Sequence, residues 1–148
     1  MMAGSGPGMV STPSTANLKT RIDTLEETYE ACLGYAAQGV SGESAGGHIR
    51  EALGRADAAL SGLGDLLLTA VTERGLQPSE RYRTFIEVLR RDASDAQAAL
   101  QLVLAQQRIS SQLVDNLNSS LHLRALLTDI FIIDEILNPH IVRAAEPS

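Results

Sequence analysis

The segment LHLRALLTDIFIIDEIL, residues 121–137, is the most apolar stretch of the chain and decides how the rest is interpreted. Its large aliphatic side chains recur at steps of three and four, the spacing of one face of an α-helix. Further large side chains lie off that face, so the apolar surface covers more than half of the circumference. A helix packed on one side needs only about a third. Because burial of each such side chain contributes roughly 1.5–3 kcal/mol, we expect protein to cover most of this surface.

Two kinds of neighbour can cover this helix, and the sequence leaves both open. Other helices of the same chain can enclose it, or a partner chain can share it. A membrane is disfavoured, because the run is shorter than the ~20 apolar residues needed to span a bilayer and carries charges near its middle. We expect Pro139 to end the helix. The candidate partner-binding residues are its large apolar side chains: Leu123, Leu126, Leu127, Ile130, Phe131, Ile133, Ile136 and Leu137.

Composition limits the fold and the class of partner. The 148 residues suit one domain, and two Phe, three Tyr and no Trp leave a core of Leu, Ile, Val and Ala. That mixture favours packed helices over a β-sandwich. The formal net charge of −6 disfavours nucleic-acid binding. The single cysteine cannot form an internal disulfide, and the N-terminal stretch lacks the pattern of a secretory signal, so we expect a cytoplasmic protein.

Three earlier segments repeat apolar residues at alternating steps of four and three, the a/d spacing of left-handed helix packing. The first begins near Ser14 or Thr15, the second runs from about residues 44–48 to 74, and the third runs from 78 or 79 to about 117. Gly75 and Pro78 separate the last two. Glycines inside the second segment indicate a kink or close packing. A strip of small residues there would admit a neighbouring helix at close range: Ala52, Ala56, Ala59 and Gly62.

Short connections imply antiparallel neighbours. The sequence therefore predicts an all-α fold over residues 15–138, an antiparallel helical bundle of about four helices with coiled-coil character. An elongated helical hairpin of the same character is the alternative. A disordered N-terminal tail is expected at 1–14 and a short C-terminal tail at 139–148.

The sequence offers little chemistry. No two of the possible metal ligands share a ligand-like spacing, and no phosphate loop or nucleophile motif is present in the sequence. Cys32 lies on the apolar seam of the first segment and is expected to be a buried core residue. We therefore expect no catalytic, cofactor or metal site, and no enzyme. The possible metal ligands considered were Cys32, His48, His122 and His140.

One local basic patch begins the third segment, where acidic residues are interleaved with arginines. An ordinary solvated, ion-paired face is the favoured interpretation, and docking of an acidic partner is the alternative. The arginines are Arg81, Arg83, Arg90 and Arg91.

Two functional hypotheses follow from these patterns. The first is a non-catalytic structural, scaffold or adaptor subunit of a multiprotein complex, which binds other helical proteins in a hetero- or homo-oligomer by helix–helix packing. The second is a small acidic helical chaperone or secretion-related protein that holds an amphipathic client segment in a groove.

Overall fold

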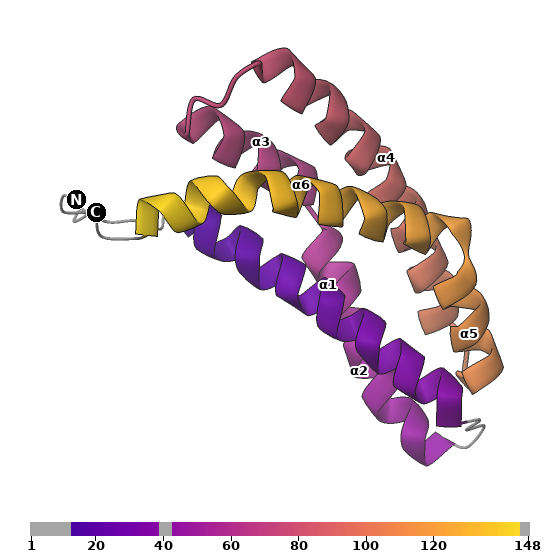
Figure 1. Cartoon of the computed structure of the whole chain (residues 1–148). Helices are drawn as coiled ribbons and strands as arrows, with labels where there is room; N and C mark the ends of the chain where they lie inside the picture. Colours follow the sequence, from indigo (N-terminus) through magenta and orange to yellow (C-terminus); the bar gives the residue numbers. More distant parts are fainter. Residues whose placement is uncertain (1–12, 39–42, 146–148) are drawn as a thin grey trace.

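The fold is all-α, as the sequence predicts (Figure 1). The computed structural model describes residues 13–38 and 43–145, and the side chains of residues 17–38 and 47–137. Over these residues it contains helices and no strand. The helices are α1 (Pro13–Gln38), α2 (Glu43–Leu60), α3 (Leu63–Glu73), α4 (Ser79–Leu104), α5 (Ser111–Ser119) and α6 (Leu121–Ala145).

The described chain has six helices where about four were expected, because two predicted segments are interrupted. The second segment divides at Gly62, whose φ of +74° is a left-handed conformation that favours glycine. The third segment ends at Leu104, well before residue 117. A short loop follows, and Ser110 starts α5 by accepting a hydrogen bond from the Leu113 amide at 3.1 Å. The expected count of about four helices is therefore not confirmed.

The ends of α3 and α5 follow the signals in the sequence. Gly75 has φ +59°, and its amide donates to the Thr72 carbonyl at 3.1 Å, while the Leu76 amide donates to Val71 at 3.2 Å. This pair of bonds is a Schellman motif, which satisfies the last carbonyls of α3. Between α5 and α6, Ser120 is extended and its hydroxyl accepts from the Leu123 amide at 3.3 Å. The helix therefore breaks at Ser120, between the third predicted segment and the last one.

The expectation that Pro139 ends the last helix is wrong, because α6 continues to Ala145. A proline removes one backbone donor and crowds one carbonyl, which can bend a helix without ending it. Most of the expected N-terminal tail and the end of the expected C-terminal tail lie outside the described residues, at 1–12 and 146–148. The domain limits stay a prediction.

The heptad spacing correctly marks the core. In α4 the buried side chains follow the predicted seam, and the same holds across α2 and α3, even though the helix breaks between them. Whether the packing is of the coiled-coil type stays a prediction. The buried seam residues of α2 and α3 are Ile49, Leu53, Ala56, Leu60, Leu63 and Leu67.

The small-residue strip of α2 is also buried, in part. Ala52, Ala56 and Ala59 are buried, and the Thr28 hydroxyl of α1 donates to the Ala52 carbonyl at 3.3 Å, so α1 lies close to the backbone of α2. Gly62 is exposed and belongs to the break after α2.

Two arginines tie separate helices together at their ends. Arg50 of α2 donates to the carbonyls of Leu104 and Gln106, each at 2.7 Å, where α4 ends. Arg21 of α1 donates to the Ser61 carbonyl, where α2 ends. Carbonyl groups at helix C-termini lack hydrogen-bond donors within their own helix. The two guanidinium groups provide those donors here.

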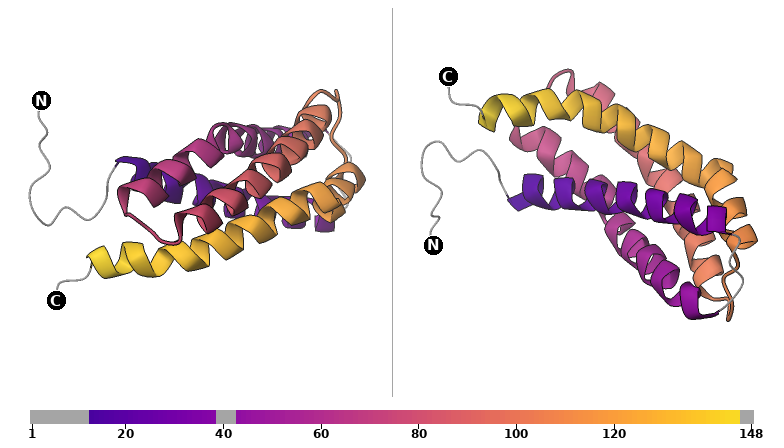
Figure 2. Two further views of the ribbon diagram at one scale, coloured as in Figure 1. Left: turned by 90° about the horizontal axis from the view of Figure 1, so that it is seen from above. Right: turned by 60° about the horizontal axis from the view of Figure 1, so that its bottom comes forward.

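The last helix packs mainly on α4, and the two lie side by side in opposite directions (Figure 2). The start of α4 faces the later part of α6, where Pro78 and Ile136 line the same groove. Further along, Asp92 of α4 faces Asp129 of α6. This antiparallel contact positions the candidate site.

Candidate functional site

Most of the candidate partner-binding residues belong to the core of this chain. Six of the eight are buried beneath the chain's other helices. The helices of this chain therefore cover one broad face of α6, which is the first of the two arrangements that the sequence left open. The six buried residues are Leu123, Leu126, Leu127, Ile130, Ile133 and Leu137.

A narrower apolar surface of α6 remains open. Phe131 is 48 % exposed and Ile136 is 45 % exposed, and both were among the candidates. Ile132, which was not, is 45 % exposed. The sequence could have indicated Ile132 as a candidate, because it lies four residues before Ile136 and therefore on the same face of the helix. The sequence showed that apolar residues lie off the main stripe but not which of them would be left uncovered.

Ile132 and Ile136 form one wall of an open groove between α4 and α6, with a volume of about 340 Å³. The start of α4 supplies the opposite wall. Phe131 is not among the lining residues, so it belongs to a separate part of the α6 surface. The groove is lined by Pro78, Arg81, Tyr82, Phe85, Ile132, Ile133 and Ile136.

Two arginines of the basic patch have different surroundings, because Arg90 contacts α3 and Arg81 lines the groove. Arg90 donates to Asp65 of α3 at 2.7 Å and lies 3.1 Å from Glu87, and these acidic neighbours raise its pKa. It covers Gly64, where a Cβ atom would come within 2.5 Å of its side chain. Arg81 instead lines the groove, and it forms no ion pair with any side chain that the structure describes.

Two carboxyl groups face each other at the α4–α6 contact, further along from the groove. Asp129 of α6 is only 8 % exposed, and Asp92 of α4 is half-buried beside it. Burial, a hydrogen bond with Asp92 and the charge of Asp92 raise the pKa of Asp129 to about 7. Asp129 Oδ2 has no hydrogen-bond partner among the described residues, and when both groups are ionised neither can donate a hydrogen bond to the other. A single shared proton relieves this repulsion.

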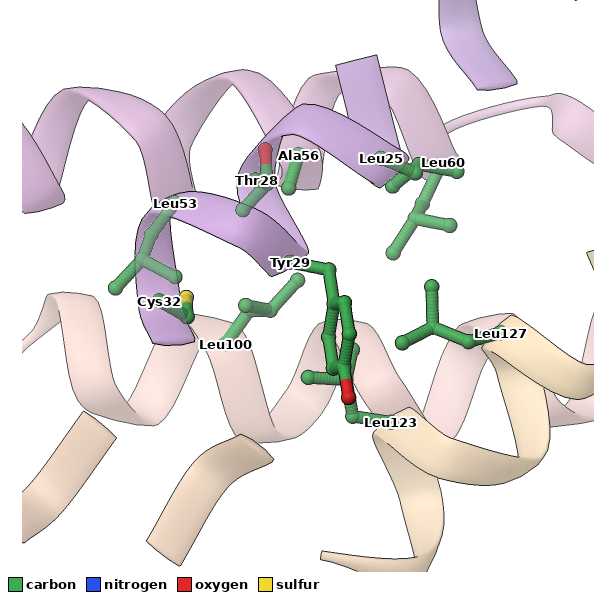
Figure 3. Close-up of a pocket in the computed structure, with 10 residues that line it drawn as sticks. All are labelled: Leu25, Thr28, Tyr29, Cys32, Leu53, Ala56, Leu60, Leu100, Leu123 and Leu127. Atoms are coloured by element: carbon green, nitrogen blue, oxygen red, sulfur yellow. The ribbon is translucent and has the colours of Figure 1, made fainter. Parts of the chain in front are cut away.

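An internal cavity lies among α1, α2, α4 and α6, and Figure 3 shows the side chains that line it. Its volume is about 10 Å³, which is at the lower limit for one water molecule. Cys32 is buried against it, and this burial raises the pKa of the thiol to about 11. The cavity is therefore too small for a ligand, and Cys32 is a core residue as the sequence predicted.

Acidic groups also approach each other between α1 and α6. Burial and nearby carboxylates raise the pKa values of Glu26 and Asp134, and Lys19, which lowers both, lines the same 140 Å³ hollow. No group of three or more possible metal ligands is present among the described residues. His48 and His122 are exposed, and the side chain of His140 lies outside the described residues.

No protein-family model matches the chain, and no characterised protein or solved structure is significantly similar to it. Across the described residues, none of the helices has the length and apolar character required to span a bilayer.

Proposed function

We propose that this protein is a non-catalytic structural or adaptor subunit that binds a helical partner chain in the α4–α6 groove. The observation that carries the proposal is the half-exposed pair Ile132 and Ile136, which faces aromatic and proline side chains across an open groove. Full burial of an isoleucine contributes roughly 1.5–3 kcal/mol, so covering two half-exposed ones is a substantial driving force for association. Single exposed apolar residues need no explanation, but a concave group of them marks a binding surface.

The lining of the groove favours binding over catalysis. Among the described side chains that line it, Arg81 is the one charged group and the Tyr82 hydroxyl is the other polar group. The described lining therefore holds no carboxylate, imidazole, amine or thiol, the groups that most often act as general base or nucleophile. A mainly apolar surface with one cation instead suits a partner's side chains.

The alternative is a small acidic helical chaperone or secretion-related protein that holds an amphipathic client segment. The limited size of the groove favours this second function, because permanent subunits usually share larger interfaces. The two proposals differ in lifetime: a subunit stays bound through purification at constant stoichiometry, whereas a client exchanges.

Affinity purification of the tagged protein from its native extract tests the proposal, with a variant carrying Ile132→Asp and Ile136→Asp. Both residues are exposed, so this variant should fold, whereas Ile130 and Ile133 are buried and their replacement would disrupt the core. The matched control is Leu102→Asp, since Leu102 is 66 % exposed on α4 and does not line the groove.

The proposal predicts a helical protein recovered in constant proportion with the native chain and the Leu102 variant, and lost with the double variant. Circular dichroism should show equal helix content in all three. Equal recovery of the partner with the native chain and both variants would show that the groove is not the binding surface. A protein recovered alone in every case would contradict the subunit function.

A further inference from the structure

We infer that the α4–α6 groove takes a single amphipathic helix of a partner chain, oriented by an acidic side chain that pairs with Arg81. This inference rests on the proposed function and names the kind of partner.

The size of the groove favours a single segment over a second copy of this chain. Seven of the described side chains line it, whereas a stable interface typically takes roughly 20–30 residues and ~800 Å² from each partner. Ile132 and Ile136 are separated by about 6 Å along α6, given a rise of ~1.5 Å per residue. Pro78 and Phe85 are about 10 Å apart along α4 by the same measure. The described part of the groove therefore accepts about two helical turns.

The walls of the groove favour a helical occupant over an extended one. Both walls are α-helices, α4 and α6, whose interior backbone groups already bond within their own helix. They therefore offer no free strand edge to which an extended peptide could add. An extended occupant would leave its backbone donors and acceptors without partners in an apolar site, which costs free energy. A helix satisfies its own backbone and presents apolar side chains at steps of three and four.

The charge of Arg81 determines which residue type the partner helix carries and in which direction that helix lies. Arg81 lines the groove beside Pro78 and Tyr82, and it has no ion-pair partner among the described side chains. An acidic side chain of the partner is therefore attracted to the Arg81 end of the groove. An amphipathic helix with an acidic residue near one end binds in the orientation that places this residue beside Arg81.

Selection from a displayed library of amphipathic helices tests this inference without a known partner. The library fixes leucines at helical spacing on one face and randomises the flanking positions among acidic, basic and neutral residues. The full-length protein is the target, and the Ile132→Asp, Ile136→Asp variant removes helices that bind elsewhere. The binding of selected peptides is then measured by fluorescence anisotropy. Arg81→Glu is compared with Arg83→Glu, which replaces an exposed arginine that does not line the groove.

The inference predicts enrichment of acidic residues near one end of the selected helices. Arg81→Glu should weaken their binding about tenfold or more, and a peptide with Lys in place of its acidic residue should recover most of that loss. Arg83→Glu should change binding less than about threefold. Selected helices with neutral or basic flanks, equal effects of the two arginine variants, or no enrichment over the double variant would each overturn the inference.

These results separate the inference from the proposed function. If a native partner is lost with the double variant but the selected helices lack an acidic end, the subunit function stands and the inference fails. If acidic helices are selected but no native partner is recovered, the site stands and the subunit function fails.

Discussion

Replacing Asp129 with asparagine should make the stability of this protein less dependent on pH. Asp129 is almost fully buried against Asp92, and its pKa is raised from 3.8 to about 7. Asparagine has nearly the same size, cannot ionise, and can donate a hydrogen bond to the Asp92 carboxylate. The substitution therefore removes a titration while keeping the contact between α4 and α6.

The sign of the effect follows from linkage. In the unfolded chain Asp129 loses its proton near pH 4, whereas in the folded protein it keeps that proton to about pH 7. The protonated carboxyl therefore stabilises the fold fully below pH 4, and this contribution is lost as the pH rises through 7. Each pKa unit corresponds to about 1.4 kcal/mol, which sets an upper limit of roughly 4 kcal/mol. Solvation of the half-buried Asp92 reduces this, and we expect about 2 kcal/mol.

Urea unfolding followed by circular dichroism at pH 4.5, 6 and 8 measures this difference. The free energy of unfolding of Asp129→Asn should exceed that of the native chain by about 2 kcal/mol at pH 8. At pH 4.5 the two should be similar. Asp95→Asn, which removes an exposed carboxylate from the same helix as Asp92, is the matched control. If the native chain and Asp129→Asn showed parallel dependence on pH, the reasoning about the Asp92–Asp129 pair would be refuted.

Three further predictions concern the packing of α6 and the ends of the helices. Ile130→Asp should lower the free energy of unfolding by more than about 3 kcal/mol, because Ile130 is buried. Ile132→Asp should change it by less than about 1 kcal/mol, because Ile132 is half-exposed. Equal urea midpoints for the two variants would contradict the assignment of Ile130 to the buried face and Ile132 to the exposed face. Arg50→Ala should cost about 1–2 kcal/mol in the same assay, because the carbonyl of Leu104 loses a charged donor, and an unchanged midpoint would show that this bond contributes nothing. Gly75→Ala should cost about 1 kcal/mol, because φ is +59° there, and a stabilised variant would contradict that conformation.

The heptad spacing predicted the core well for a physical reason. Burial depends on which side of a helix faces its neighbours, and residues at steps of three and four share that side. The spacing of Leu60, Leu63 and Leu67 therefore stayed correct across the break between α2 and α3. The break itself was less visible, because glycine permits both a kink and close packing. Gly62 provides the break in the helix, and Gly64 permits the close packing of Arg90.

The candidate site was only partly predictable from the sequence. The excess apolar surface of α6 was evident, but most of it covers the chain's own core. Which side chains remain open depends on how α4 lies across α6, and no local pattern sets that geometry. For the same reason Arg81 could not be separated from Arg90, since only the tertiary contact with Asp65 distinguishes them.

Methyl NMR of the isoleucine side chains during titration with a selected helix tests the central claim most directly. The claim is that one face of α6 is core and that the α4–α6 groove beside it binds a partner. We predict shifts at the methyl groups of Ile132 and Ile136, which line the groove, and no shift at those of Ile22 and Ile49, which are buried elsewhere. Binding that shifts Ile22 and Ile49 while Ile132 and Ile136 stay unchanged would contradict the claim.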